Sequence, residues 1–191
     1  MKALEKIRTQ LLNGAVELGK LAAKPFYRNE NWLHTHHDLY SLPTGSIGRE
    51  MVDYLDSKHF ILAKGYEPHD VKHILTGYEM DMLGEIRMQW YLCGNGNHTL
   101  PVLFTLSFGS LLVPEHIFTF WQDYQRGKKA KSLFYLDYAA LVYEDKASIQ
   151  KALHILDFPC ESTSILQTVA YWCQSLLRKH SIHTISFPFH S

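Results

Sequence analysis

Apolar residues recur along this chain at steps of three and four, a spacing typical of amphipathic helices. Residues 1–24 show it clearly, with a stripe that ends before Pro25 and comprises Leu4, Ile7, Leu11, Ala15, Leu18 and Ala22. Two segments, KSLFYL and TISFPF, are candidates for β-strands, and Pro188 weakens the case for the second. The pattern therefore predicts a helical protein that begins with an amphipathic helix over residues 1–24.

Turn and capping residues divide the middle of the chain into further helices. Ser46 is a candidate N-cap for one helix, and Pro68 suits the first turn of another. Gly77 is expected to end that second helix, and Asp81 to cap the next. Because no internal repeat or linker interrupts the series, residues 1–191 are predicted to form a single all-α domain, a multi-helix bundle.

The composition supports a folded chain and argues against one class of partner. Hydrophobic residues make up 46% of the sequence, and 19 basic residues balance 19 acidic ones. This balance argues against nucleic acid as a partner. Three cysteines without paired spacing favour a reducing compartment. The tail over residues 180–191 contains a proline and shows no period, so we expect it to be irregular.

One stretch, residues 88–114, contains no Asp, Glu, Lys or Arg. The sequence GNGNH and Pro101 interrupt it, so it lacks the run of about twenty apolar residues that a membrane-spanning helix requires. We interpret this stretch as a buried or membrane-facing helix.

The segment HDVKHILTGYEMDMLGE, residues 69–85, carries the candidate chemistry. On a helix, residues four apart lie about 40° apart around the axis, so His69 and His73 project from one face and can bind one ion. Asp70 lies about 100° around from His69. It can reach a metal only if its side chain bends, or it can orient a water or a histidine.

Glu85 joins these residues only if the chain turns. It lies twelve residues beyond His73, which is about 18 Å along a straight helix. A break at Gly77 would return Glu85 on a second helix, so we predict a helix hairpin with a metal between its arms. Such ligands suit zinc, iron or manganese, or magnesium if carboxylates and a phosphate dominate. The alternative is that these are ordinary polar residues on the wet face of a helix.

Two known arrangements differ from this one. Helical zinc proteases place a glutamate directly after the first histidine, where this chain has the shorter Asp70. A metal-dependent phosphohydrolase with a His-Asp pair needs further helical ligands, for which His59 and Asp137 are candidates.

Taken as HDxxH followed after eleven residues by Glu, the segment resembles the motif of the COQ-four family of ubiquinone (coenzyme Q) biosynthesis proteins. The neighbouring LPTGSIGRE, LGEIRMQW and QRGKKAKSL segments are similar to further blocks of that family, in the same order. The resemblance spans residues 42–149. It implies an all-helical protein whose metal-binding and catalytic residues are His69, Asp70, His73 and Glu85.

The resemblance also implies a function. Proteins of this family act on polyprenylated aromatic precursors of quinones, for which an oxidative decarboxylation has been assigned, and they work beside other quinone-biosynthesis proteins. An apolar groove is expected to hold the prenyl tail. The alternative is a non-catalytic isoprenoid-lipid carrier or scaffold that presents intermediates to other enzymes, and a metal-dependent phosphohydrolase is a third hypothesis.

Basic residues suggest where a ligand or a membrane is bound. Arg126, Lys128, Lys129 and Lys131 follow an aromatic helix, an arrangement that fits anionic lipid headgroups. Arg49 and Arg87 are further candidates for binding a phosphate or carboxylate of the ligand. Since the sequence has no long mitochondrial leader, we expect a bacterial protein, cytoplasmic and peripheral on the inner face of the membrane, and the apolar content suggests a homodimer.

The histidine-rich sequence HTHHDL, residues 34–39, offers a second candidate metal site. We expect it to be a surface turn, with opportunistic metal binding by His34 and His36 or His37 as the alternative.

Overall fold

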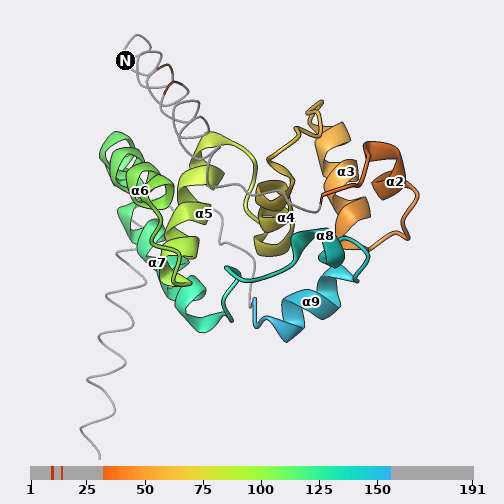
Figure 1. Ribbon diagram of the computed structural model, residues 1–191. Coiled ribbons are helices and arrows are strands. Elements are labelled where there is room, and N and C mark those ends of the chain that lie inside the picture. Colours follow the sequence, from red (N-terminus) through yellow and green to blue (C-terminus); the bar gives the residue numbers. More distant parts are fainter. Residues whose placement is uncertain (1–9, 11–13, 15–31, 156–191) are drawn as a thin grey trace, which may run out of the picture. The chain divides into compact units, whose positions relative to one another are not determined.

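The computed structural model describes residues 10, 14 and 32–155, in which helices are joined by turns and irregular segments (Figure 1). The elements of residues 32–155 are α2 (His36–Tyr40), α3 (Ile47–Ser57), α4 (Glu67–Thr76), α5 (Met82–Gly94), α6 (Leu100–Leu112), the 3-10 helix η2 (Pro114–His116), α7 (Ile117–Lys129), α8 (Tyr138–Leu141) and α9 (Lys146–Ala152). The all-α prediction is confirmed, and the KSLFYL segment forms no strand. The predicted 1–24 helix and 180–191 tail lie outside the described residues.

Helix ends fall where local sequence signals place them. The Ser46 hydroxyl accepts a hydrogen bond from the backbone N–H of Arg49 and caps α3. Pro68 stands in the first turn of α4, where its missing N–H costs nothing. Gly77 ends α4 with φ of 76°, a left-handed conformation that glycine adopts without steric penalty.

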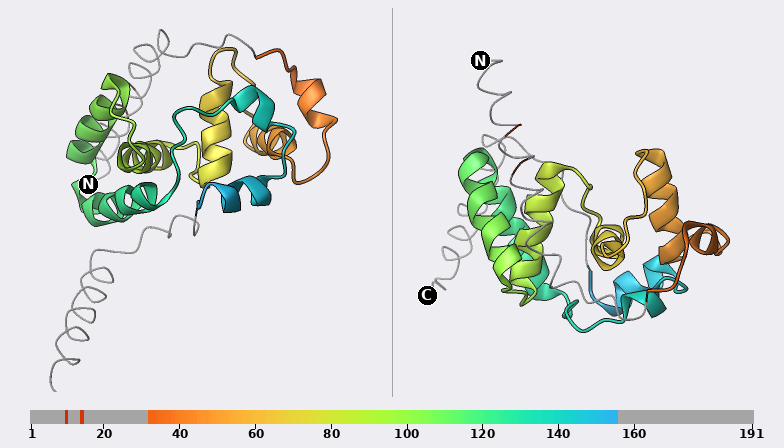
Figure 2. Two further views of the ribbon diagram at one scale, coloured as in Figure 1. Left: turned by 60° about the horizontal axis from the view of Figure 1, so that its bottom comes forward. Right: turned by 45° about the horizontal axis from the view of Figure 1, so that its top comes forward.

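The described helices pack into two groups, one around a single hydrophobic core and the other around two smaller ones. In the α3–α4 group, α2, α3, α4 and α8 surround buried residues that include Val52, Val71 and Val142. In the α5–α7 group, α5 packs against both α6 and α7, burying Met88 and Phe120 among others. Figure 1 and both views of Figure 2 show α5, α6 and α7 side by side, with α4 beside α3.

Two glycines allow α5 and α7 to approach closely. A Cβ added to Gly94 would lie 2.0 Å from the backbone carbonyl oxygen of Tyr124, and one added to Gly127 would lie 2.0 Å from that of Tyr91. Side chains at these positions would therefore force the helices apart. This contact fixes α5, the helix that carries Glu85, onto α7.

The outer side of α6 and α7 presents apolar side chains to solvent, namely Leu100, Leu103, Phe104, Leu111, Ile117, Phe118 and Trp121. Of the two interpretations of this stretch, burial is therefore excluded for most of α6, whose buried residues are Val102 and Gly109. Among the described helices, none is by itself long and apolar enough to cross a membrane. The pair formed by α6 and residues 114–129 reaches the required length and composition, but it is bent by 107°.

Candidate metal centre

The first arm of the centre is α4. The four-residue spacing places His69 and His73 on one face of this helix, with their ring centroids 4.8 Å apart. His73 is buried and the His69 side chain is 13% exposed. The two imidazoles therefore stand on successive turns, one enclosed by protein and the other at the margin of the site.

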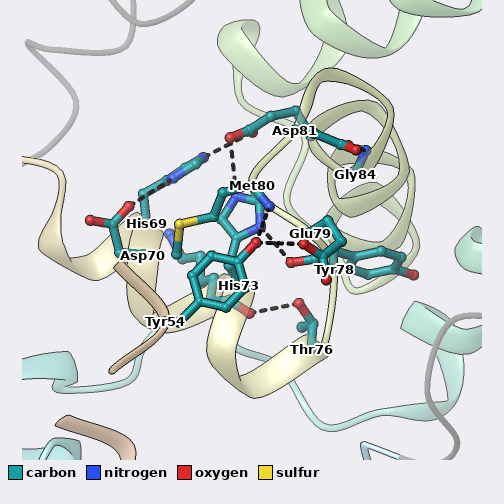
Figure 3. A network of polar contacts seen from close by, with 12 residues as sticks. Tyr54, His69, Asp70, His73, Thr76, Tyr78, Glu79, Met80, Asp81 and Gly84 are labelled. Carbon is teal, nitrogen blue, oxygen red and sulfur yellow. Dashed lines mark hydrogen bonds and ion pairs between the residues drawn. The ribbon is translucent and has the colours of Figure 1, made fainter. Parts of the chain in front are cut away.

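The turn between α4 and α5 is held from several sides (Figure 3). The carboxylate of Asp81 accepts a hydrogen bond of 2.7 Å from the N–H of Gly84 and so caps α5. The phenol of Tyr54 on α3 donates to Glu79 and accepts a hydrogen bond from the N–H of Met80. These contacts cap α5 and hold the turn against α3.

The predicted turn at Gly77 is present, and it makes a corner between the two helices. In each view of Figure 2 one of α4 and α5 is seen nearly end-on while the other runs along the page. The two helices thus cross instead of lying antiparallel along their length. As a result they meet only near the corner, where the first turn of α5 faces the histidines.

Glu85 stands in that first turn and contacts both histidines. Its Oε1 lies 3.1 Å from Nε2 of His73, and its Oε2 lies 3.2 Å from Nε2 of His69. One ligand atom from each of the three residues can be chosen so that all lie within 4.8 Å of one another. This geometry could hold a metal ion, and it links the α3–α4 group to the α5–α7 group.

The hydrogen bonding of the histidines fits a cation. Nδ1 of His73 lies 2.9 Å from the carbonyl oxygen of Tyr78, which can only accept, so Nδ1 carries a proton. Nε2 of the same ring faces the carboxylate of Glu85, another acceptor. A cation placed between the ring and the carboxylate would satisfy both, because a metal ion binds the Nε2 lone pair directly and the carboxylate oxygen at the same time. The donor set of two imidazoles and a carboxylate thus fits a divalent ion.

The electrostatics of the centre agree with this demand for positive charge. Burial opposes the charged form of His69, but the charge of Glu85 and hydrogen bonds to Asp70 and Glu85 outweigh it and raise the His69 pKa to about 9. Burial also opposes the charged form of Glu85, but the neighbouring His69 and His73 hold its pKa well below the usual range. The carboxylate of Glu85, whose side chain is 14% exposed, is therefore ionised and ready to bind a cation.

Asp70 lies beside the cluster of three. Its Oδ1 is 3.7 Å from Nδ1 of His69, on the side of the ring that faces away from Glu85. This position suits a carboxylate that orients the His69 ring better than one that binds the metal directly.

The arginines proposed to bind ligand already have protein partners. Arg87 donates from Nε and Nη2 to the two carboxylate oxygens of Asp123, at 2.8 and 3.1 Å, and both residues are buried. Arg49 donates to Asp53 and to the carbonyl of Tyr40 at the surface. These pairings favour structural roles for both.

The basic cluster at the end of α7 divides into two parts. Arg126 turns inward and donates to the phenol oxygen of Tyr78 at 2.6 Å. The remaining three side chains, Lys128, Lys129 and Lys131, are exposed.

The other candidate ligands lie apart from the centre. His34 contacts the Ala139 carbonyl and Tyr143, while His36 pairs with Asp56 at 2.9 Å. These contacts engage His34 and His36 with protein partners, but the predicted surface turn is wrong in part, because His36–Tyr40 form the capped helix α2 and bury Leu39. Among the described residues, neither His59 nor Asp137 belongs to the cluster that could hold a metal.

A cavity of about 500 Å³ opens beside the start of α4, on the α3–α4 group. Apolar Trp32, Phe60 and Ile61 line it together with polar residues that include His36 and Lys64. The three residues of the metal cluster do not line this cavity, so a groove for a prenyl tail beside the centre stays a prediction.

Sequence reasoning missed Asp123 and Tyr78. Asp123 is buried within an aromatic stretch of α7, where the sequence carries no sign that it pairs with Arg87. Tyr78 lies in the turn and contributes both its carbonyl and its phenol to contacts. The sequence carries one signal for this network: an acidic residue, Asp123, and two arginines, Arg87 and Arg126, occur in stretches rich in apolar residues.

The comparisons with known proteins agree on one family. A sequence profile described as "Coenzyme Q (ubiquinone) biosynthesis protein Coq4" matches residues 56–159. The mitochondrial ubiquinone biosynthesis protein COQ4 homolog of Xenopus tropicalis is 27% identical over 107 residues. That match covers 47% of this chain and 38% of the relative, so the chain spans little more than a third of the relative's length.

A solved structure shows the same fold. The crystal structure of a Nostoc punctiforme protein named for ubiquinone biosynthesis matches with a TM-score of 0.53 and 19% identity, over 78% of this chain and 83% of that chain. Fold and site together define an all-α protein with two histidines and a glutamate gathered at a helical corner. The chain belongs to the Coq4 family of coenzyme Q (ubiquinone) biosynthesis proteins.

Proposed function

We propose that this protein binds a divalent metal ion through His69, His73 and Glu85 and uses it on a polyprenylated aromatic precursor of ubiquinone. The observation that carries the proposal is the convergence of three ligand atoms within 4.8 Å from two helices. Zinc, iron and manganese fit two imidazoles and a carboxylate, and magnesium fits if substrate oxygens complete the shell. The three residues leave further coordination positions for substrate or water.

The reaction we propose is an oxidative decarboxylation with hydroxylation. The bond between the ring carbon and the carboxyl carbon breaks, and a bond from that ring carbon to an oxygen atom of dioxygen forms. Two electrons and two protons from a reductant balance the release of carbon dioxide and water. When bound, a divalent ion supplies a Lewis acid for the ring carboxylate.

The chain's own residues hold this centre in place. The Tyr78 carbonyl keeps the Nδ1 proton of His73 and leaves Nε2 facing the site. Asp70 stands on the Nδ1 side of His69 and can do the same for that ring. The ionised carboxylate of Glu85 supplies negative charge that a divalent ion needs.

A lipid surface is the proposed source of the substrate. The exposed apolar side chains of α6 and α7 adjoin three exposed lysines, an arrangement that suits acyl chains beside anionic headgroups. We therefore propose peripheral binding at the inner face of a bacterial membrane, where other quinone-biosynthesis proteins or a second copy of this chain could also meet this surface.

The membrane proposal is tested by sedimentation with vesicles of phosphatidylglycerol and phosphatidylcholine. The double change Phe118→Glu and Trp121→Glu is expected to abolish binding, and Lys128→Ala with Lys129→Ala to weaken it most at low salt. Ile61→Glu is the matched control, since Ile61 is 84% exposed on the other helical group. Equal binding by all variants would contradict the proposal.

A non-catalytic carrier of isoprenoid lipid is the alternative, favoured by the exposed apolar surface of α6 and α7. Incubation with carboxyl-labelled prenylated hydroxybenzoic acid, dioxygen, a reductant and each metal separates the two. Catalysis predicts labelled carbon dioxide from wild type and none from His73→Ala. A prenyl lipid that co-purifies with wild type but not with His73→Ala, without carbon dioxide from any metal form, would establish the carrier instead.

A further inference from the structure

Asp123 joins both sides of the corner at which the metal centre lies. This residue of α7 is 1% exposed. Its Oδ2 accepts from Nε of Arg87, and its Oδ1 accepts from Nη2 of the same guanidinium and from the phenol of Tyr78 at 2.8 Å. Arg87 lies two residues beyond Glu85 on α5, and Tyr78 belongs to the turn. A single buried carboxylate thus holds the turn and the helix that follows it.

Tyr78 transmits this contact to the histidine. Its phenol contacts Asp123 and Arg126, and its carbonyl oxygen accepts the Nδ1 proton of His73 at 2.9 Å. The ring also lies 5.9 Å from that of Tyr91, in an edge-on arrangement within the core of the α5–α7 group. Because the charged network holds the phenol of Tyr78, it also restrains the backbone carbonyl of that residue. The orientation of the His73 ring, which donates to this carbonyl, therefore depends on the network.

We infer that Asp123 is a positioning residue for the metal centre: through Tyr78 it fixes the ring orientation and tautomer of His73, and through Arg87 it fixes the first turn of α5, which carries Glu85. The inference deepens the proposed function and rests on it for its link to metal binding. The geometric part, from Asp123 through Tyr78 to the Nδ1 proton of His73, holds for the metal-free protein as well.

A purely structural ion pair would make a different prediction. Removing a buried hydrogen bond anywhere in the core lowers stability, but only a positioning role changes the His73 ring in a protein that is still folded. Tyr78→Phe deletes the phenol and keeps the backbone carbonyl. Tyr138→Phe is the matched control, because its buried phenol donates one hydrogen bond of 2.6 Å to the Leu133 carbonyl.

The test follows the imidazole N–H of His73 by nitrogen-15 NMR in the metal-free full chain. In wild type we expect Nδ1 to be protonated and protected from exchange with solvent. Tyr78→Phe, which removes the hydrogen bonds of the phenol with Asp123 and Arg126, is expected to speed that exchange about fivefold, and Tyr138→Phe to leave it unchanged. Asp123→Asn should act in the same direction as Tyr78→Phe, and if Asp123→Asn does not fold, Tyr78→Phe alone decides.

Metal affinity supplies the second measurement. With cobalt as the probe, Tyr78→Phe is expected to raise the Kd about tenfold and to alter the visible absorption spectrum, while Tyr138→Phe does neither. If wild type binds no cobalt but Tyr78→Phe still speeds the exchange, the positioning role stands and the proposed function fails. If Tyr78→Phe and Tyr138→Phe leave the exchange equally unchanged, the positioning role is overturned whatever the metal affinity.

Discussion

Glu85 places Oε1 3.1 Å from Nε2 of His73, although twelve residues and a helix end separate them in the chain. The contact crosses between two groups of helices with separate cores, because His73 belongs to α4 and Glu85 to α5. An ion held by both residues would therefore join two parts of the fold as well as form a reactive centre.

Metal binding is expected to stabilise the folded protein. An ion that binds only the folded state at a free concentration 100 times its Kd adds about 2.7 kcal/mol to the free energy of unfolding. Thermal unfolding with zinc and with a chelator measures this difference, and Tm should fall on chelation. In Glu85→Gln, zinc and chelator should give nearly equal Tm values, whereas an undiminished difference would show that the stabilising ion binds elsewhere.

Gly77 is expected to matter both for stability and for the centre. Its φ of 76° suits glycine, so Gly77→Ala should lower the free energy of unfolding by about 1 kcal/mol and Gly77→Asn by less. Because Gly77 sets the corner between α4 and α5, Gly77→Ala should also weaken metal binding. Denaturant titration and metal titration measure the two effects.

The control for that experiment is Gly96, which follows α5 and has φ of 96° with open space around the position of a Cβ. Gly96→Ala is expected to cost a similar free energy of unfolding and to leave metal affinity unchanged. Equal metal affinities in the two alanine variants would contradict a role for the corner.

Stability should fall in alkali because of Tyr91. Burial raises the pKa of Tyr91 to about 12, against an ordinary value of 10, with nearby Arg126 opposing the shift. Between pH 10 and pH 12 the unfolded chain releases the Tyr91 proton and the folded chain keeps it. The contribution of Tyr91 to the free energy of unfolding is therefore complete below pH 10 and is lost as the pH rises through 12. The loss amounts to roughly 1 kcal/mol per pH unit.

Tyr91→Phe tests that relationship. The Tyr91 hydroxyl is buried without a hydrogen-bond partner among the described residues, so its removal should not destabilise the protein at pH 7. The variant should also lose less stability than wild type between pH 10 and pH 12 in urea unfolding experiments. A parallel decline in both proteins would assign the alkaline effect to other groups.

The sequence predicted those features that depend on residues close together in the chain. Ser46, Gly77 and Asp81 mark helix ends through bonds or dihedral angles within a few positions, and all three do so in the structure. The rise of a helix similarly required a break between His73 and Glu85 before they could meet. Local geometry was therefore sufficient to predict the break at Gly77, but the predicted hairpin was wrong, since α4 and α5 cross instead of lying antiparallel.

Contacts between distant positions could not be predicted in this way. Asp123 pairs with Arg87, 36 residues earlier, and with Tyr78, 45 residues earlier, and nothing near any of the three announces the network. For the same reason the sequence offers Arg87 as a candidate for ligand binding without any sign of its buried pairing with Asp123. The division of the helices into two groups likewise depends on which apolar faces meet in space.

Metal analysis of the purified full chain tests the central claim most directly. Wild type, Glu85→Gln and the control Asp56→Asn would be loaded with zinc, desalted and analysed by mass spectrometry. Asp56 is a suitable control because its carboxylate also pairs with a histidine, His36, but at the exposed surface. We predict about one equivalent of zinc in wild type and in Asp56→Asn, and a large loss in Glu85→Gln. Equal zinc content in all three proteins would contradict a metal centre at His69, His73 and Glu85.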